Sequence, residues 1–226
     1  MITSRIYRDG KLEKGSDFDP AAVEACRSSG EHRIWIDVVE PTDAELELLK
    51  RTLGLQELSV EDSSRWGQRP KVEFYPDYVF VVLHGLRIGD GDELVDSEVH
   101  LFAGQRFYLL TIRREPLFEF RRAVERASRD TEIVREGIGF HLYLLLDEVV
   151  DEYLNVVDRL EDLSDDAEER VFRDDADEGL QEVLFRLKRR VVRFRRAVAP
   201  MREVLDLLGE DADMVTPPLQ PYYRDV

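Results

Sequence analysis

The clearest hydrophobic pattern lies between residues 140 and 163, where apolar side chains recur at alternating three- and four-residue steps. This spacing predicts an α-helix that packs along its length against another helix. The seam consists of Leu146, Val149, Tyr153, Val156, Leu160 and Leu163. On a helix of 3.6 residues per turn, Asp147, Asp151 and Asp158 fall together on one flank of this seam. One helix is therefore predicted to carry both a packing face and a row of carboxylates.

A second seam with the same spacing predicts a partner helix between residues 180 and 208. It consists of Leu180, Leu184, Leu187, Val191, Phe194, Val198, Met201, Leu205 and Leu208. Pro200 lies inside this pattern and is expected to kink the helix. The two seams together predict a long antiparallel helical hairpin over residues 138–208, with its turn near residues 174–179.

The two predicted helices carry opposite charge. Asp and Glu dominate residues 147–178, whereas the second helix carries Arg186, Lys188, Arg189, Arg190, Arg193, Arg195, Arg196 and Arg202. We expect an antiparallel pair to set acid against base. Exposed ion pairs contribute only ~0–1 kcal/mol each, so the apolar seam must provide most of the stability. Alternatively, the basic face binds anions or lipid headgroups.

Shorter patterns before residue 138 alternate between strand and helix. Strands are predicted at residues 34–38, 71–75, 78–83, 98–102 and 107–112, and a tight turn at 8–11 joins two more. Helices are predicted at residues 19–26, 58–62 and 116–129, and from a Thr42–Glu45 capping box to a cap at Gly54. This mixture indicates an α/β (α+β) fold, with a mixed β-sheet layered between helices and followed by the long hairpin. We expect an α/β domain at residues 1–137, the hairpin at 138–208, and a linker rich in Asp and Pro that begins at 209.

Composition narrows the function classes. The 226 residues carry a formal net charge of −17, which argues against a nucleic-acid partner and suits either the collection of cations or simple solubility. Cys26 is the sole cysteine, so no disulfide forms within the chain and a reducing compartment is expected. No apolar run approaches the ~20 residues of a membrane helix, and no signal peptide follows Met1, so we expect a soluble chain.

Four patches, in this order, resemble the CorA-type divalent cation channels of bacteria. They are Trp35-Ile36-Asp37 with Pro41-Thr42, then Val60-Glu61-Asp62 with residues 68–73, then residues 144–153, and lastly residues 200–205 with 221–226. The family's Gly-Met-Asn pore signature and its membrane helices are absent. The resemblance therefore implies a cytoplasmic domain that stops at the start of the truncated pore-leading helix, within residues 209–226, on the cytoplasmic face of a membrane.

The resemblance also implies a homopentamer in the full-length protein, with regulatory Mg²⁺ between neighbouring cytoplasmic domains. By position, Asp62 matches a residue that faces an acidic partner on the neighbouring subunit. Glu61, Asp147 and Asp225 match residues around a second regulatory ion, and Asp151 is a weaker candidate. The loop at residues 63–67 departs from the family pattern, so no ligand is assigned to it. The transported cation, whether Mg²⁺, Co²⁺ or the Zn²⁺ of a zinc-transporting relative, is left open.

The implied mechanism is a Mg²⁺ sensor. Mg²⁺ takes six oxygens and keeps several waters, so one or two carboxylates from each side of an interface suffice. Without the ion, carboxylates ~4 Å apart repel by about 1–4 kcal/mol per pair, so ion binding holds the subunits in the closed state.

Structural roles for the same carboxylates stay open. Glu61 and Asp62 could form a salt-bridge cluster with Arg65 and Arg69, and Asp147 and Asp151 could be solvated or paired with the basic helix. Asp225 could be a charge at the start of the next helix.

Two further function classes remain. One is a soluble adaptor that uses the charged hairpin. The other is a metal-dependent enzyme, which we do not expect, because the chain has no Gly-rich phosphate loop, no metal motif with His and no nucleophile beside a base.

Overall fold

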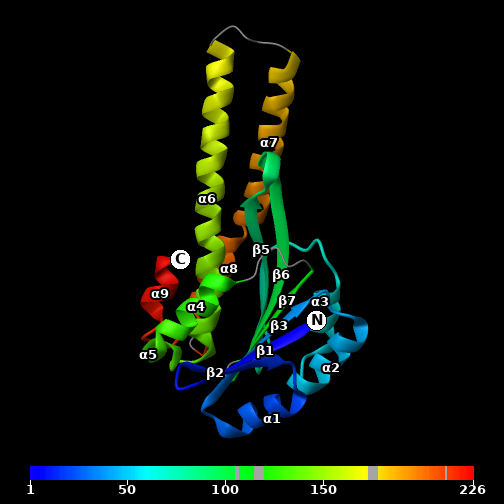
Figure 1. Ribbon diagram of the computed structural model, residues 1–226, viewed down its shortest axis with the longest axis vertical. Coiled ribbons are helices and arrows are strands. Elements are labelled where there is room, and N and C mark those ends of the chain that lie inside the picture. Colours follow the sequence, from blue (N-terminus) through cyan, green and yellow to red (C-terminus); the bar gives the residue numbers. More distant parts are fainter. Residues whose placement is uncertain (105–106, 115–119, 173–177, 212) are drawn as a thin grey trace.

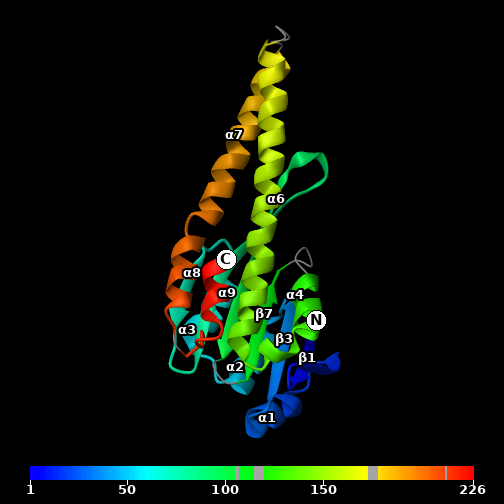
Figure 2. The same ribbon diagram turned by 90° about the vertical axis from the view of Figure 1, so that its left-hand side faces the viewer.

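Figures 1 and 2 show the fold in a computed structural model, which describes residues 1–104, 107–114, 120–172, 178–211 and 213–226. The described strands form one mixed sheet in the order β2-β1-β3-β7-β6-β5-β4, in which β3 and β7 are parallel and the other neighbours antiparallel. The strands are β1 (Ile2–Arg8), β2 (Lys11–Asp17), β3 (His32–Val39), β4 (Lys71–Phe74), β5 (Tyr78–Ile88), β6 (Leu94–Gly104) and β7 (Tyr108–Arg113). The helices are α1 (Pro20–Ser29), α2 (Asp43–Leu53), α3 (Glu57–Ser64), η1 (Asp90–Asp92), α4 (Arg121–Arg129), α5 (Thr131–Val134), α6 (Ile138–Phe172), α7 (Glu178–Val198), α8 (Met201–Gly209) and α9 (Gln220–Asp225). The predicted fold class, a mixed sheet between helices followed by long helices, is confirmed.

Local signals in the sequence explain where several elements begin and end. Asp9 and Gly10 have positive φ, as the tight turn between β1 and β2 requires. Thr42 and Glu45 form the predicted capping box at the start of α2, and Gly54 closes that helix in the left-handed conformation. The described part of the helix predicted at residues 116–129 is α4; residues 116–119 lie outside the described residues.

Both faces of the sheet are buried. Along β5, Val79, Val81 and Leu83 point into one hydrophobic cluster, and Phe80 and Val82 point into another. The first cluster is shared with α4, α5, α6, α8 and α9, and the second with α1, α2 and α3. Figure 1 shows these two groups of helices on opposite sides of the strands. The sheet therefore separates α3 from α6.

The predicted hairpin is present, and its first helix is longer than the seam suggested. α6 begins against the sheet, where residues 138–146 are all buried, and then extends beyond it beside α7 (Figures 1 and 2). The seam residues Leu146, Val149, Tyr153, Val156 and Leu160 are buried as predicted, whereas Leu163 is half-buried. Because the base of α6 belongs to the main core, the domain boundary near residue 137 stays a prediction.

The second seam is less continuous than predicted. The helical pattern breaks at Ala199 and Pro200, which separates α7 from α8 and agrees with the kink expected at the proline. Leu184 and Val191 are 44% and 46% exposed, so the unbroken packed seam expected from the heptads is wrong over this stretch. The predicted turn at residues 174–179 lies mainly outside the described residues.

The expected pairing of acid against base along the hairpin is also wrong in the described part of the two helices. No ion pair joins the described residues of α6 to those of α7. Instead, Arg159 on α6 pairs with Asp92 in η1 at 2.8 Å, and Arg186 pairs with Glu182 on its own helix. Arg159 on α6 is therefore neutralised by η1 and not by α7.

The segment predicted as a linker from residue 209 packs closely on α6. Met214, Val215 and Leu219 are 2% exposed or less. A Cβ atom at Gly139 would lie 1.9 Å from the carbonyl oxygen of Met214, so only glycine allows this approach. Tyr223 on α9 donates a hydrogen bond of 2.8 Å to the carbonyl of Gly139. A linker is therefore the wrong description of this segment, because apolar burial and a backbone contact fix it on the base of α6.

Candidate functional site

Asp147 on α6 lies where the base of that helix meets α4. Its carboxylate pairs with Arg126 and accepts a hydrogen bond of 3.1 Å from the hydroxyl of Tyr143, one helical turn earlier. Arg126 also donates to that hydroxyl at 3.2 Å, and its guanidinium lies over the Tyr143 ring. Burial opposes the charge of Arg126, but the contacts with Tyr143 and Asp147 outweigh it and raise its pKa. Asp147 is thus a half-buried carboxylate that already has a cationic partner.

The next turns of α6 continue this contact with α4. Arg122 donates to Glu152 at 2.9 Å and to Asp151 at 3.4 Å. Glu148 accepts a hydrogen bond of 2.7 Å from the backbone N–H of Ala123 in the first turn of α4. Burial raises the pKa of Glu148, against the opposing effect of that hydrogen bond. Asp147 and Asp151 of the predicted row, together with Glu148 and Glu152, therefore hold α4 against α6. Asp158, the third member of the row, is exposed.

α9 brings Asp225 to the same end of α6. The rings of Tyr222 and Tyr223 contact Tyr143 with centroid separations of 5.2 and 6.1 Å. Asp225 is exposed, and it has no ion-pair partner among the described residues. Tyr143 therefore connects the helix of Asp225 with the carboxylate of Asp147, and Figure 2 shows α9 beside the base of α6.

Glu61 and Asp62 lie on the other side of the sheet, in α3. Glu61 pairs with Arg65 one turn later, and Asp62 accepts a hydrogen bond of 2.5 Å from Lys71 at the start of β4. Lys71 also donates to Glu73 at 2.6 Å. Burial lowers the pKa of Lys71, but Asp62 and Glu73 outweigh burial and raise it. Arg69, the other expected partner, forms no ion pair with these carboxylates.

One copy of the chain does not assemble the predicted metal site. Across the described ranges, no three His, Cys, Asp or Glu side chains converge in a group that could hold a metal ion. The structure brings Asp147 and Asp151 onto one surface with Asp225 nearby, and it places Glu61 and Asp62 together on the opposite side. An ion that touches both groups would therefore have to lie between two copies.

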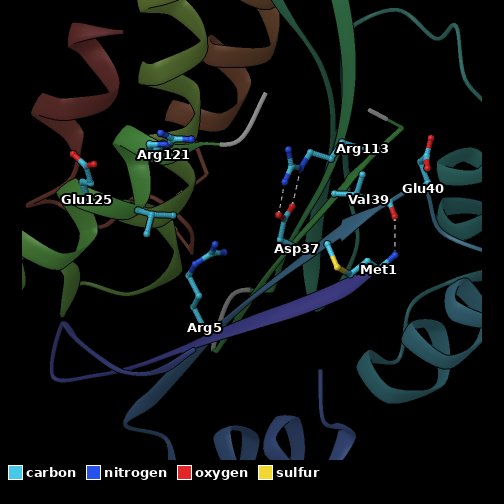
Figure 3. Close-up of a pocket in the computed structure, with 9 residues that line it drawn as sticks. Met1, Arg5, Asp37, Val39, Glu40, Arg113, Arg121 and Glu125 are labelled. Atoms are coloured by element: carbon cyan, nitrogen blue, oxygen red, sulfur yellow. Dashed lines mark hydrogen bonds and ion pairs between the residues drawn. The ribbon is translucent and has the colours of Figure 1, made fainter. Parts of the chain in front are cut away.

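The sequence analysis missed a cavity of about 580 Å³ at the carboxyl ends of the parallel strands β3 and β7 (Figure 3). Asp37 lies near the end of β3, and Arg113 is the last residue of β7. The two side chains form an ion pair in the wall of the cavity. Arg5 and Arg121 extend from β1 and α4 toward the same space in Figure 3. The available signal was Asp37 at the end of a buried strand, because ligands of α/β sheets often bind at such ends. The sequence analysis used Asp37 only as part of one patch that resembles the family.

Comparison with known proteins decides the family. The sequence model of the CorA-like Mg²⁺ transporter proteins matches residues 30–226. This chain belongs to the CorA-like Mg²⁺ transporter family. The cobalt/magnesium transport protein CorA of Thermotoga maritima is 31% identical over 198 residues, which are 85% of this chain and 55% of that protein. The family resemblance predicted from the four patches is therefore confirmed.

Solved structures of a CorA soluble domain and of a ZntB cytoplasmic domain have the same fold. The soluble domain of CorA from Methanocaldococcus jannaschii superposes with a TM-score of 0.79 at 22% identity, covering 100% of this chain and 86% of that one. The ZntB cytoplasmic domain from Vibrio parahaemolyticus gives 0.63 at 15% identity, covering 85% of this chain and 75% of that one. At these identities the likeness concerns the fold alone.

The matches also show how much of each relative's length corresponds to this chain. It spans about half the length of the bacterial CorA-like relatives, 52% and 55% in two cases. None of the described helices combines the length and the apolar composition of a membrane span. The family consists of transporters and is not an enzyme family, which agrees with the expectation that the chain is not an enzyme.

Proposed function

We propose that this chain is the Mg²⁺-sensing domain of a divalent cation transporter that lies at the cytoplasmic face of a membrane. The observation that carries the proposal is the family match over residues 30–226, supported by the CorA soluble-domain fold. In this proposal the full-length protein is a homopentamer that transports Mg²⁺ or Co²⁺ through membrane helices beyond this chain. A zinc-transporting protein is the alternative, because the family resemblance leaves the transported cation open.

The regulatory ions would bind between copies. Candidate ligands are Glu61 and Asp62 on one side of the sheet, and Asp147 and Asp225, with Asp151 as a weaker member, on the other. A cyclic oligomer joins unlike patches of successive subunits, so each copy would present Glu61 to the second group of its neighbour. Asp62 would face an acidic partner on the neighbouring subunit that is not part of this chain. The separation of the two groups by the sheet supports this arrangement.

The ion pairs in the single chain are weak enough to be exchanged. The side chains of Glu61 and Arg65 are 46% and 67% exposed, and those of Asp62 and Lys71 are 31% and 30% exposed. Pairs at such surfaces contribute about 0–1 kcal/mol, which an interfacial Mg²⁺ with its retained waters can replace. Because carboxylates from two copies repel without the ion, Mg²⁺ would favour the packed, closed arrangement of the subunits. Loss of Mg²⁺ would then destabilise this closed arrangement.

Sedimentation and thermal unfolding of the chain with and without millimolar Mg²⁺ test this proposal. We expect Mg²⁺ to promote self-association and raise the unfolding temperature, and Na⁺ at equal ionic strength to do neither. Glu61→Gln/Asp62→Asn and Asp147→Asn should each reduce the response. Glu24→Gln, which alters an exposed pair within α1, serves as the matched control. An equal response of all variants and wild type, or none in any, would contradict the sensor mechanism.

A further inference from the structure

A groove lined with arginines runs between α7 and the core of the protein. Two adjoining cavities, of about 740 and 270 Å³, share His84, Asp96 and Arg193 in their walls. The larger lies between α7 and the loop at residues 68–70, and the smaller continues to Trp66 and to the end of β7. We call this space the arginine groove, after Arg69, Arg114, Arg193, Arg195 and Arg196, which line it.

These five guanidinium groups are unpaired in a chain that has an excess of acid. In the part of the chain that the structure describes, none of them donates a hydrogen bond or forms an ion pair. By contrast, Arg65, Arg122, Arg126 and Arg159 each hold a carboxylate. The formal net charge of the chain is −17, so acidic residues outnumber basic ones. The arginines of the groove therefore do not lack partners because the chain has too few carboxylates.

The two carboxylates in the groove wall are already satisfied by other groups. Asp96 pairs with Nδ1 of His84 at 2.6 Å, while Nε2 of His84 contacts the carbonyl of Gln68 at 2.9 Å. Two acceptors at one imidazole favour its doubly protonated form. Burial lowers the pKa of His84, but Asp96 and the Gln68 carbonyl outweigh it and raise the pKa. The Asp96–His84 pair therefore leaves the positive charge of the groove in place.

Glu98 is committed in the same way. It accepts hydrogen bonds from the backbone N–H groups of Gly67 and Gln68 at 2.5 and 3.3 Å, and it contacts Nε2 of His100 at 2.8 Å. Burial raises the pKa of Glu98, but these contacts outweigh it and lower the pKa. The acidic helix α6 forms no ion pair with the described part of α7, so it does not neutralise the groove either.

We propose that the arginine groove binds an oligophosphate, an anion with two or more linked phosphoryl groups. Guanidinium groups donate two parallel hydrogen bonds to phosphate oxygens, and five of them require more negative charge than one phosphate provides. The larger cavity lies within the ~300–1,000 Å³ range of small-molecule sites. A small anion responds mainly to the local charge, because salt screens the distant acidic surface beyond ~8 Å, whereas a long nucleic acid would be repelled.

Fluorescence titration with inorganic tripolyphosphate, in buffer without divalent cations, tests the site. Trp66 lines the smaller cavity and stacks on His100, whereas Trp35 is 2% exposed in the core, so the signal should come from Trp66. Arg69→Gln/Arg196→Gln should weaken binding at least tenfold. The matched control Lys188→Gln/Arg189→Gln removes the same charge from exposed positions of α7 outside the groove, and it should change affinity less than twofold.

Binding to lipid vesicles, measured beside binding of tripolyphosphate, distinguishes a soluble oligophosphate from a lipid headgroup. Binding of tripolyphosphate with the expected variant dependence supports a soluble ligand. Binding only to vesicles of phosphatidic acid in phosphatidylcholine, and not to phosphatidylcholine alone, would overturn the oligophosphate and assign the groove to a lipid headgroup, because that headgroup carries a single phosphoryl group. Equal losses in the groove and control variants, or binding of neither probe, would overturn the site. Because these titrations contain no Mg²⁺, their outcome is independent of the sensor proposal.

Discussion

Asp37 and Arg113 join the carboxyl ends of the two parallel strands through a two-point ion pair. Nε and one terminal nitrogen of Arg113 donate to the two oxygens of Asp37 at 3.0 and 2.6 Å. Thr111 adds a hydrogen bond of 2.7 Å to the same carboxylate. The side chains are only 9% and 7% exposed, so the pair is largely removed from water. It lies in the wall of the cavity in Figure 3 and fixes β3 against β7 there.

We therefore expect Asp37→Asn to be strongly destabilising. The change removes the carboxylate charge that faces the buried guanidinium of Arg113, and breaking a buried pair in this way costs about 3–5 kcal/mol in other proteins. Urea unfolding followed by circular dichroism measures the loss. As a control, Glu24→Gln breaks the exposed pair with Arg27 and should change the free energy of unfolding by less than about 1 kcal/mol. Similar small changes in both variants would show that the Asp37 pair contributes no more than a surface pair.

Tyr153 provides a second anchor, between the hairpin and the sheet. Its hydroxyl donates a hydrogen bond of 2.6 Å to the carbonyl of His84 in β5, and the residue is 4% exposed. Tyr153→Phe keeps the ring but leaves a buried carbonyl without this donor, so we expect a loss of about 1–3 kcal/mol in the free energy of unfolding. Leu154→Ala, at the adjacent position that is 61% exposed, should be nearly neutral in the same measurement. A neutral Tyr153→Phe would mean that water replaces the lost donor.

The elements that the sequence predicted well are those specified by local chemistry. The capping box at Thr42 and the turn at Asp9-Gly10 satisfy backbone groups only a few residues away, so they can be read without knowledge of the fold. The seam of α6 is equally readable because its period persists over many turns. The seam residues are apolar along one face, so they become buried against the sheet and the helices that pack on that face.

The errors concern interactions between distant segments. Opposite charge on two helices does not reveal that Arg159 finds Asp92, or that Arg122 and Arg126 take the carboxylates of α6 from a different helix. In the sequence, the residues after 209 resemble a linker. Nothing in that stretch indicates that Met214 packs on α6 at Gly139, where the missing side chain makes room for the Met214 carbonyl. The cavity at Asp37 was missed because the parallel pairing of β3 and β7 is a long-range property.

His141 should make the protein sensitive to acid. It is 1% exposed, its Nδ1 contacts the carbonyl of Gly137 at 3.3 Å, and its Nε2 has no hydrogen-bond partner in the described residues. Burial lowers its pKa to about 4 from 6.5, against a smaller raising effect of the Gly137 carbonyl. Between these values the unfolded chain binds a proton that the folded chain does not. Stability from this residue is therefore present above about pH 6.5 and is lost as the pH falls toward about 4.

The size of this effect follows from the pKa difference. About 2.5 pH units at about 1.4 kcal/mol each give roughly 3.5 kcal/mol. Urea unfolding of wild type and His141→Leu at about pH 7 and about pH 4.5 measures it. The variant should lose less stability than wild type on acidification, even if it is less stable at neutral pH. Parallel losses in the two proteins would show that His141 is not the group responsible.

The pairing of Arg126 with Asp147 yields a prediction about metal binding. If Asp147 is a Mg²⁺ ligand, Arg126 competes with the ion for the same carboxylate, and Arg126→Gln should strengthen Mg²⁺ binding. The side chains are 37% and 18% exposed, so the competition is worth about 1 kcal/mol, or roughly fivefold in affinity. Calorimetric titration with Mg²⁺ measures the change, and Asp147→Asn in the Arg126→Gln background should abolish the gain. Arg129→Gln removes the same charge from the same helix at a distance from Asp147 and should leave the affinity unaltered. A gain of the same size in Arg129→Gln would reduce the effect to general electrostatics and remove Asp147 from the ligand set.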